Sequence, residues 1–180
     1  MSGHNKWSKI KHKKGAADAK RSKLFSILSR QITIEARGCG GDKSHPALRK
    51  AIERAKAANI PNDNIERAVA RATSTEASSL EEVRYEAYGP GGVAMLIEGI
   101  TDNTNRTSQE IKHLLSEHGG SLATPGAAIW AFTKVDAETG SSWQANAPIP
   151  LSESEKEKVL NLITTLEEHD DVKNVYDNSA

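Results

Sequence analysis

The hydrophobic periodicity of the chain changes near residue 82, and this change restricts the fold more than any other feature. Before it, apolar residues recur every three or four positions, as in Leu24, Leu28 and Ile32, which is typical of helices that bury one face. After it, Met95 and Ile97 belong to a run in which apolar residues occur at alternate positions, which is typical of a strand. The sequence therefore predicts a helical segment followed by a mixed segment of strands and helices.

Three helices are predicted in the first segment. The first begins near Ser22 and ends at Gly38, the second lies within 44–59 with Pro46 in its first turn, and the third lies within 61–72. Their expected inward positions are Leu24, Leu28, Ile32, Ala36, Leu48, Ala51, Ile52, Ala55, Ile65, Ala68, Val69 and Ala72.

The second segment predicts an α+β domain. Two strands meet at the turn 89–92, a helix follows within 105–120, and a strand is expected over 127–135. A last helix within 152–171, capped by Ser152 or Ser154, precedes a strand at 172–177. This last helix is expected to bury Val159, Leu160, Ile163 and Leu166. Both helices would cover one face of an antiparallel sheet in a ferredoxin-like sandwich. The predicted organisation is a helical domain at 1–72, a linker at 73–82 and an α+β domain at 83–180.

Charge also divides the chain, at residue 72, just before the predicted linker. Residues 1–72 contain 17 Lys and Arg against 6 Asp and Glu, a formal charge of +11, whereas residues 73–180 contain 7 against 18, a formal charge of −11. The zero net charge of the whole chain therefore conceals two strongly charged halves. A lobe of +11 indicates a polyanionic partner, and the acidic half can face a basic protein.

The N-terminal run is the strongest candidate binding element. It is dense in cations, with Trp7, His4 and His12 between them, and such a basic arm can neutralise phosphates while an aromatic ring stacks on a base. The alternative is a solvated tail whose Trp7 folds back onto the helices. The candidate nucleic-acid-binding residues are Lys6, Trp7, Lys9, Lys11, His12, Lys13, Lys14, Lys20, Arg21, Lys23 and Arg30.

A polar loop at 101–107 is a secondary candidate, because it follows a buried strand and precedes a helix. Asn105, Arg106 and Thr107 would meet a phosphate at the helix N-terminus. The alternative is that Asp102, Asn103 or Asn105 simply caps the helix.

Other functional classes are disfavoured. A single cysteine, Cys39, permits no internal disulfide and no paired-cysteine zinc motif. The glycine-rich turn at 89–92 lacks the lysine of a phosphate-binding loop and precedes a strand. The six histidines are scattered and no nucleophile–base pair stands out, so we expect no enzyme activity, cofactor or metal. With no secretory signal and no membrane-spanning run, a cytoplasmic protein is expected.

Several long stretches resemble one known family. "GHNKWSKIKHKKGAADAKRSKLFSILSRQITIEARGCGGD", "AKAANIPNDNIERA" and "RYEAYGPGGVAMLIEGITDNTNRT" are similar to the YebC/PmpR family, as is the terminal "VLNLITTLEEHDDVKNVYDN". The resemblance covers about residues 3–134 and 148–178. It implies a helical N-terminal lobe followed by α/β domains, one of them inserted in another. In this chain only a short stretch separates the "IWAF" segment from the last helix, so the inserted domain is expected to be missing.

The resemblance also implies a function in gene expression. Members are described as DNA-binding transcriptional regulators, and others, including a mitochondrial translational activator of cytochrome c oxidase, act at the ribosome. We therefore expect a DNA-binding transcriptional regulator, with a translation factor that binds ribosomal RNA as the alternative. The lysine-rich arm and the absence of a base-reading helix mildly favour RNA. A protein–protein adaptor that uses the acidic domain is the third possibility.

Overall fold

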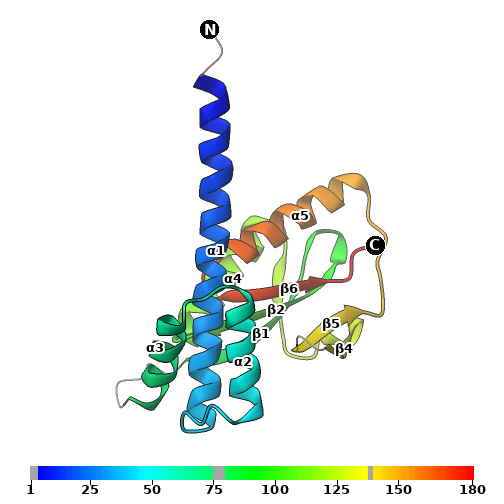
Figure 1. Cartoon of the computed structure of the whole chain (residues 1–180). Helices are drawn as coiled ribbons and strands as arrows, with labels where there is room; N and C mark the ends of the chain where they lie inside the picture. Colours follow the sequence, from blue (N-terminus) through cyan, green and yellow to red (C-terminus); the bar gives the residue numbers. More distant parts are fainter. Residues whose placement is uncertain (1–3, 75–79, 138–139) are drawn as a thin grey trace. The chain divides into compact units, whose positions relative to one another are not determined.

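The computed structural model divides the chain into two compact units, Met1–Ala77 and Ser78–Ala180 (Figure 1). The backbone is described for residues 4–74, 80–137 and 140–180, and side chains for 17–72, 74, 80–135 and 142–180. Part of the predicted linker, residues 75–79, lies outside the described residues. The two units are described separately below.

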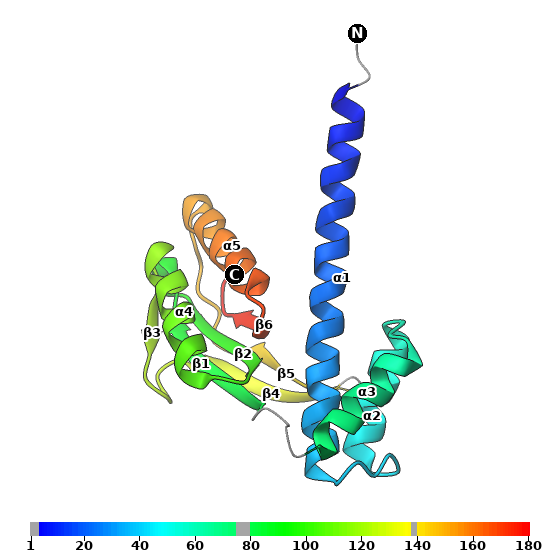
Figure 2. The same cartoon turned by 90° about the vertical axis from the view of Figure 1, so that its left-hand side faces the viewer.

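The first unit consists of α1 (His4–Gly38), α2 (Pro46–Ala57) and α3 (Asn62–Thr73). The predicted second and third helices are confirmed, but the first begins at His4 and not near Ser22. Figure 2 shows α1 as a long rod, with α2 and α3 packed against the half that leads to its C-terminal end. The prediction failed because the sequence before Ser22 has no apolar stripe, although its lysines and alanines are good helix formers.

The core of the helical unit contains mostly small and medium-sized side chains. Its buried members are Ile32, Ala36, Leu48, Ala51, Ala55, Ile60, Ile65, Ala68, Val69 and Ala72. All four inward positions predicted for α3 are buried. Leu24, predicted to face inward, is instead 48% exposed, because the packed part of α1 begins at Phe25 and Ile27. The exposed stretch 17–22 lies before this packed part.

The second unit is an α+β domain around a four-stranded antiparallel sheet of order β3-β1-β2-β6. Its elements are β1 (Glu81–Tyr88), η1 (Pro90–Gly92), β2 (Ala94–Thr101), α4 (Thr104–Glu117), β3 (Ser121–Ala123), η2 (Ile129–Ala131), β4 (Phe132–Ala137), β5 (Gly140–Ala145), α5 (Glu153–Glu168) and β6 (Val172–Asp177). The predicted turn at 89–92 is confirmed as the short helix η1. Gly91 has a φ of 73°, a conformation that favours glycine.

The two faces of the sheet are covered differently. Helices α4 and α5 pack on one face, as predicted, through Ile111, Leu115, Val159, Leu162 and Leu166. Leu160 was predicted to be buried in α5, but it is 63% exposed and Leu162 takes its place. The inward stripe thus shares Val159 and Leu166 with the predicted one but extends to Leu162 in place of Leu160.

The opposite face of the sheet is covered by η2 and the β4–β5 hairpin, through Ala128, Ala131 and Phe132. The predicted strand 127–135 therefore divides into η2 and β4, and β4 pairs only with β5. The α+β class and the layer of two helices on one face are as predicted, whereas this second, two-stranded sheet was not predicted. No helix in the part of the chain that the structure describes is both long and apolar enough to cross a membrane.

Candidate nucleic-acid interface

The continuity of α1 changes the geometry of the predicted basic arm. A helix turns by about 100° per residue, so positions three, four or seven apart fall on the same side. In α1, positions 6, 9, 13, 20, 23, 30 and 37 follow such spacings, and every one of them is Lys or Arg. Each step of seven drifts by about 20°, so this row winds gradually around the helix, by about 140° between Lys6 and Arg37. We call this set, Lys6, Lys9, Lys13, Lys20, Lys23, Arg30 and Arg37, the α1 track. Of the predicted candidates, Lys11 falls on the opposite side of the helix from Lys20.

The predicted candidates differ in how much the structure says of them. Lys6, Trp7, Lys9, Lys11, His12, Lys13 and Lys14 belong to α1, but their side chains lie outside the described residues. Lys20 and Arg21 are exposed, and Lys23 and Arg30 are half-buried. The Arg21 guanidinium lies 5.4 Å from the centre of the Phe25 ring, which holds its stem against the helix.

The acidic residues of the helical unit are largely engaged by other partners. Lys43 pairs with Glu66 at 2.5 Å, and Arg49 lies 3.8 Å from Glu53. The carboxylate of Asp42 accepts hydrogen bonds from the backbone and hydroxyl of Ser44, which lower its pKa. Six acidic residues cannot neutralise 17 Lys and Arg, so residues 1–72 keep a formal surplus of +11.

The loop predicted as a secondary site is held by its own side chains. Asn103 is the N-cap of α4, and its side chain accepts a hydrogen bond from the backbone of Arg106 at 3.0 Å. Helix capping, the predicted alternative to a phosphate site, is therefore present in this loop. The Arg106 guanidinium lies 2.8 Å from Asp171 and 3.0 Å from Asp102. The contact with Asp171, and to a smaller extent that with Asp102, raises the pKa of Arg106.

Thr107 is buried, and its hydroxyl donates to the carboxylate of Asp171 at 2.7 Å. This corrects its prediction as a phosphate ligand, because the hydroxyl is satisfied inside the domain. Asn105 is exposed at the first turn of α4. Arg106 is already paired with carboxylates, so a phosphate would have to compete with them.

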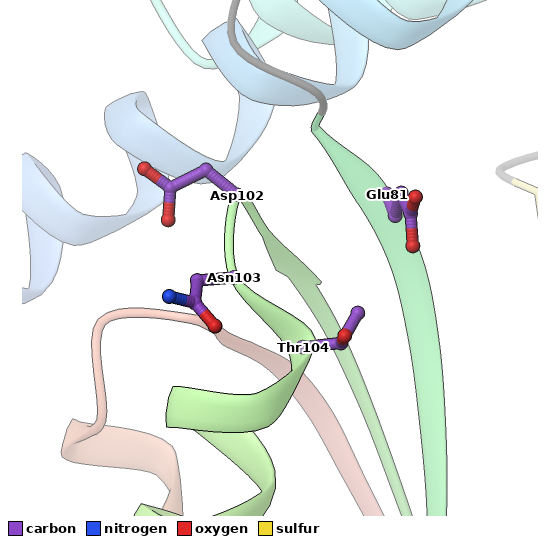
Figure 3. A pocket seen from close by; sticks show the side chains of 4 residues that line it. All are labelled: Glu81, Asp102, Asn103 and Thr104. Carbon is purple, nitrogen blue, oxygen red and sulfur yellow. The ribbon is translucent and has the colours of Figure 1, made fainter.

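A small polar pocket lies beside this loop. Figure 3 shows that Asp102, Asn103 and Thr104 line it from the loop and the first turn of α4, and Glu81 from the start of β1. Two carboxylates in the lining disfavour a phosphate. The pocket therefore adds no support to this loop as an anion site.

Three potential metal ligands, Glu110, His169 and Asp171, have ligand atoms within 4.8 Å of one another. The Arg106 guanidinium reaches two of them, with Nε 3.9 Å from Glu110 and Nη2 2.8 Å from Asp171. His169 Nε2 lies 2.9 Å from Glu110. A side-chain cation thus already occupies this cluster, and the contacts describe an ion-pair network.

The fold and the charges define a two-domain α+β protein with a basic helical domain and an acidic sandwich domain. The family model described as "TACO1/YebC protein N-terminal domain" matches residues 5–75, and "TACO1/YebC second and third domain" matches residues 80–137 and 135–179. The chain belongs to the TACO1/YebC family.

Relatives agree with this assignment. Two proteins named "Probable transcriptional regulatory protein", from Petrotoga mobilis and Desulfatibacillum aliphaticivorans, are each 57% identical over 136 residues, 74% of this chain and 54% or 55% of the relative. The chain thus spans about half the length of the curated relatives it matches. The crystal structure of a conserved hypothetical protein, Aq1575 from Aquifex aeolicus, is similar at a TM-score of 0.82 and 31% identity, covering 91% of each chain.

Proposed function

We propose that this chain is a DNA-binding transcriptional regulator whose basic helical domain binds the phosphate backbone of DNA along the α1 track. The observation that carries the proposal is a continuous row of seven Lys and Arg positions, spaced three, four or seven apart, along a single 35-residue helix. A row of cations on a straight element can follow a polyanion, and each contact releases counterions. The names of the relatives support a role in transcription.

The acidic domain is assigned a different role. Its formal surplus of negative charge repels a polyanion, and its polar loop at 101–107 is largely occupied by internal contacts. We therefore assign nucleic-acid binding to the helical domain, and to the acidic domain the contact with a basic protein partner.

The test compares two double variants of the full-length chain with equal charge change. In Lys13→Glu/Lys20→Glu both substitutions lie on the track, whereas in Lys11→Glu/Lys14→Glu they lie off it. We expect the first to weaken binding of a fluorescent DNA duplex more than the second. It should also reduce the slope of log K against log salt by about one per lysine removed. Equal losses would mean that only total charge matters, and the track would be rejected.

A competition experiment addresses the choice of polyanion. Purified ribosomes and unlabelled duplex DNA are each titrated against the labelled duplex at about 0.15 M salt. Displacement by duplex at lower phosphate concentration than by ribosomes supports the transcriptional role. The opposite order would transfer the assignment to the translation factor, and no binding of either would reject the helical domain as a nucleic-acid-binding unit.

A further inference from the structure

Arg54 is an unusual residue of the helical domain. Its Nε is the only buried side-chain nitrogen or oxygen without a hydrogen-bond partner among the described residues. The residue is half-buried on α2, one position before the fully buried Ala55. Buried polar atoms are nearly always hydrogen-bonded, because an unpaired one has lost its water without compensation. Arg54 Nε thus has no acceptor among the described residues.

The helix that carries Arg54 supplies no acidic partner one turn away. The positions one helical turn away on either side are Lys50, Ala51, Ala57 and Ala58, none of which carries a carboxylate. Arg54 has no ion pair within the described part of the chain. Its place in the last turn of α2 favours a cation through the helix dipole, but this leaves Nε unpaired.

The one carboxylate of α2 serves another residue. Glu53 pairs with Arg49 at the i,i+4 spacing, on a different side of the helix from Arg54. Lys50, one turn before Arg54, is exposed and likewise has no ion pair among the described residues. Lys50 and Arg54 thus form a pair of cations on one side of α2, without an acid between them.

We propose that Arg54, together with Lys50, binds a backbone phosphate of the nucleic acid at a second site, separate from the α1 track. On binding, the guanidinium turns from its packed position toward the phosphate, and the unpaired Nε gains an oxygen acceptor. A guanidinium presents two parallel donors to a phosphate, and its stem can remain packed while the head moves. This inference rests on the proposed function, because it takes the nucleic acid as the source of the phosphate.

The proposal predicts opposite effects of one substitution on stability and on binding. Arg54→Met keeps the length of the stem and removes the unpaired donor, so the midpoint of thermal unfolding should stay the same or rise. The affinity for the DNA duplex should fall by about tenfold or more, the usual value of a hydrogen bond to a charged group. The slope of log K against log salt should fall by about one.

Two further variants provide the controls. Arg49→Met removes an exposed arginine of the same helix that already has a carboxylate partner, and we expect a smaller loss of affinity. Arg54→Lys keeps the charge but not the paired donors, so its salt slope should equal that of the wild type while its affinity falls. If Arg54→Met does not fold, the affinity of Arg54→Lys still tests the phosphate site.

The outcomes separate this proposal from the proposed function. Unchanged affinity in Arg54→Met, or a loss of stability together with affinity, would overturn the phosphate site and make Arg54 a packing residue. A wild-type protein that binds neither duplex nor ribosomes would reject the proposed function itself, and Arg54 would lose its assigned ligand with it. That result is read from the wild type alone, before any Arg54 variant is measured.

Discussion

The Oδ2 atom of Asp171 lies 2.7 Å from the hydroxyl oxygen of Thr107, and both residues are buried. The same carboxylate oxygen lies 2.8 Å from the Arg106 guanidinium. This contact joins the turn before β6 to the first turn of α4, two parts of the chain separated by most of the domain. The loop at 101–107 therefore has a defined role in holding the sandwich together.

Replacing Asp171 should destabilise the α+β domain. We expect Asp171→Ala to lower the free energy of unfolding by about 2–3 kcal/mol, because charged hydrogen bonds are lost and the Thr107 hydroxyl remains buried. Urea denaturation measures the change. Glu168→Ala, at an exposed acidic residue three positions earlier, is the matched control, with an expected change within about 0.5 kcal/mol. Equal effects of the two substitutions would contradict a specific role of Asp171.

The surroundings of Glu86 should make the stability of the α+β domain depend on pH. Burial raises the pKa of this carboxyl, but the backbone N–H groups of Gly126, Ala128 and Ile129 donate to it and bring its pKa below the ordinary value of 4.5. A lowered pKa in the folded state stabilises the protein above about pH 4.5, and this contribution is lost as the pH falls through the folded-state pKa.

Glu86→Gln should therefore cost about 1–3 kcal/mol at neutral pH, since one amide oxygen cannot serve three donors. The difference in unfolding free energy between the wild type and this variant should shrink as the pH falls below 4.5. Denaturant unfolding at a series of pH values measures it. A difference that stays constant with pH would show that the charge of Glu86 has no part in the effect.

Tyr176 should ionise only at strongly alkaline pH. Burial, together with the charge of Glu98 and a hydrogen bond to it, raises the pKa of Tyr176 to about 12. This contribution to stability is complete below about pH 10 and is lost as the pH rises through about 12. Ultraviolet absorbance of tyrosinate follows the titration, and Tyr176→Phe identifies the step. In Glu98→Gln the step should move to lower pH; no movement would leave burial as the sole cause.

Ser152 should contribute more to stability than Ser154, although both precede the apolar part of α5. Ser152 and Glu155 form a capping box, in which the Ser152 hydroxyl accepts from the Glu155 backbone and the Glu155 carboxylate accepts from the Ser152 backbone at 2.8 Å. Ser152→Ala should cost about 1 kcal/mol. Thermal unfolding of Ser152→Ala and Ser154→Ala compares the two directly, and equal losses would argue against the capping box.

Sequence reasoning worked where burial and periodicity act together. The helix α3, the turn at 89–92 and the start of α5, where Ser152 or Ser154 was predicted as the cap, all have local signals that the packing reinforces. It failed for the first part of α1, because a helix without an apolar face has no hydrophobic period to detect. It also exchanged Leu160 for Leu162, since these residues flank Val159 and Leu166 on opposite sides of the helix and only the contact with the sheet decides between them.

The candidate site shows the same division. The lysines and arginines of the α1 track were visible as a cluster, but their alignment depends on a helix that the sequence did not predict that far. The absence of an acid one turn from Arg54 can be read from the sequence. That its Nε is buried cannot, because burial depends on how α2 packs in the domain.

Because α1 is one continuous helix, the angular position of each basic residue around the helix axis depends on its position in the sequence. From His4 to Gly38 the helix rises about 50 Å, and each added residue would turn everything before it by about 100°. One alanine inserted after Asp18 would therefore carry Lys6, Lys9 and Lys13 away from the side that holds Lys20, although it replaces no charged residue of the chain. Seven inserted residues would restore the phase to within about 20°. The spacing of cations along this chain is thus tied to the pitch of a helix, and their contacts can be lost by rotation alone.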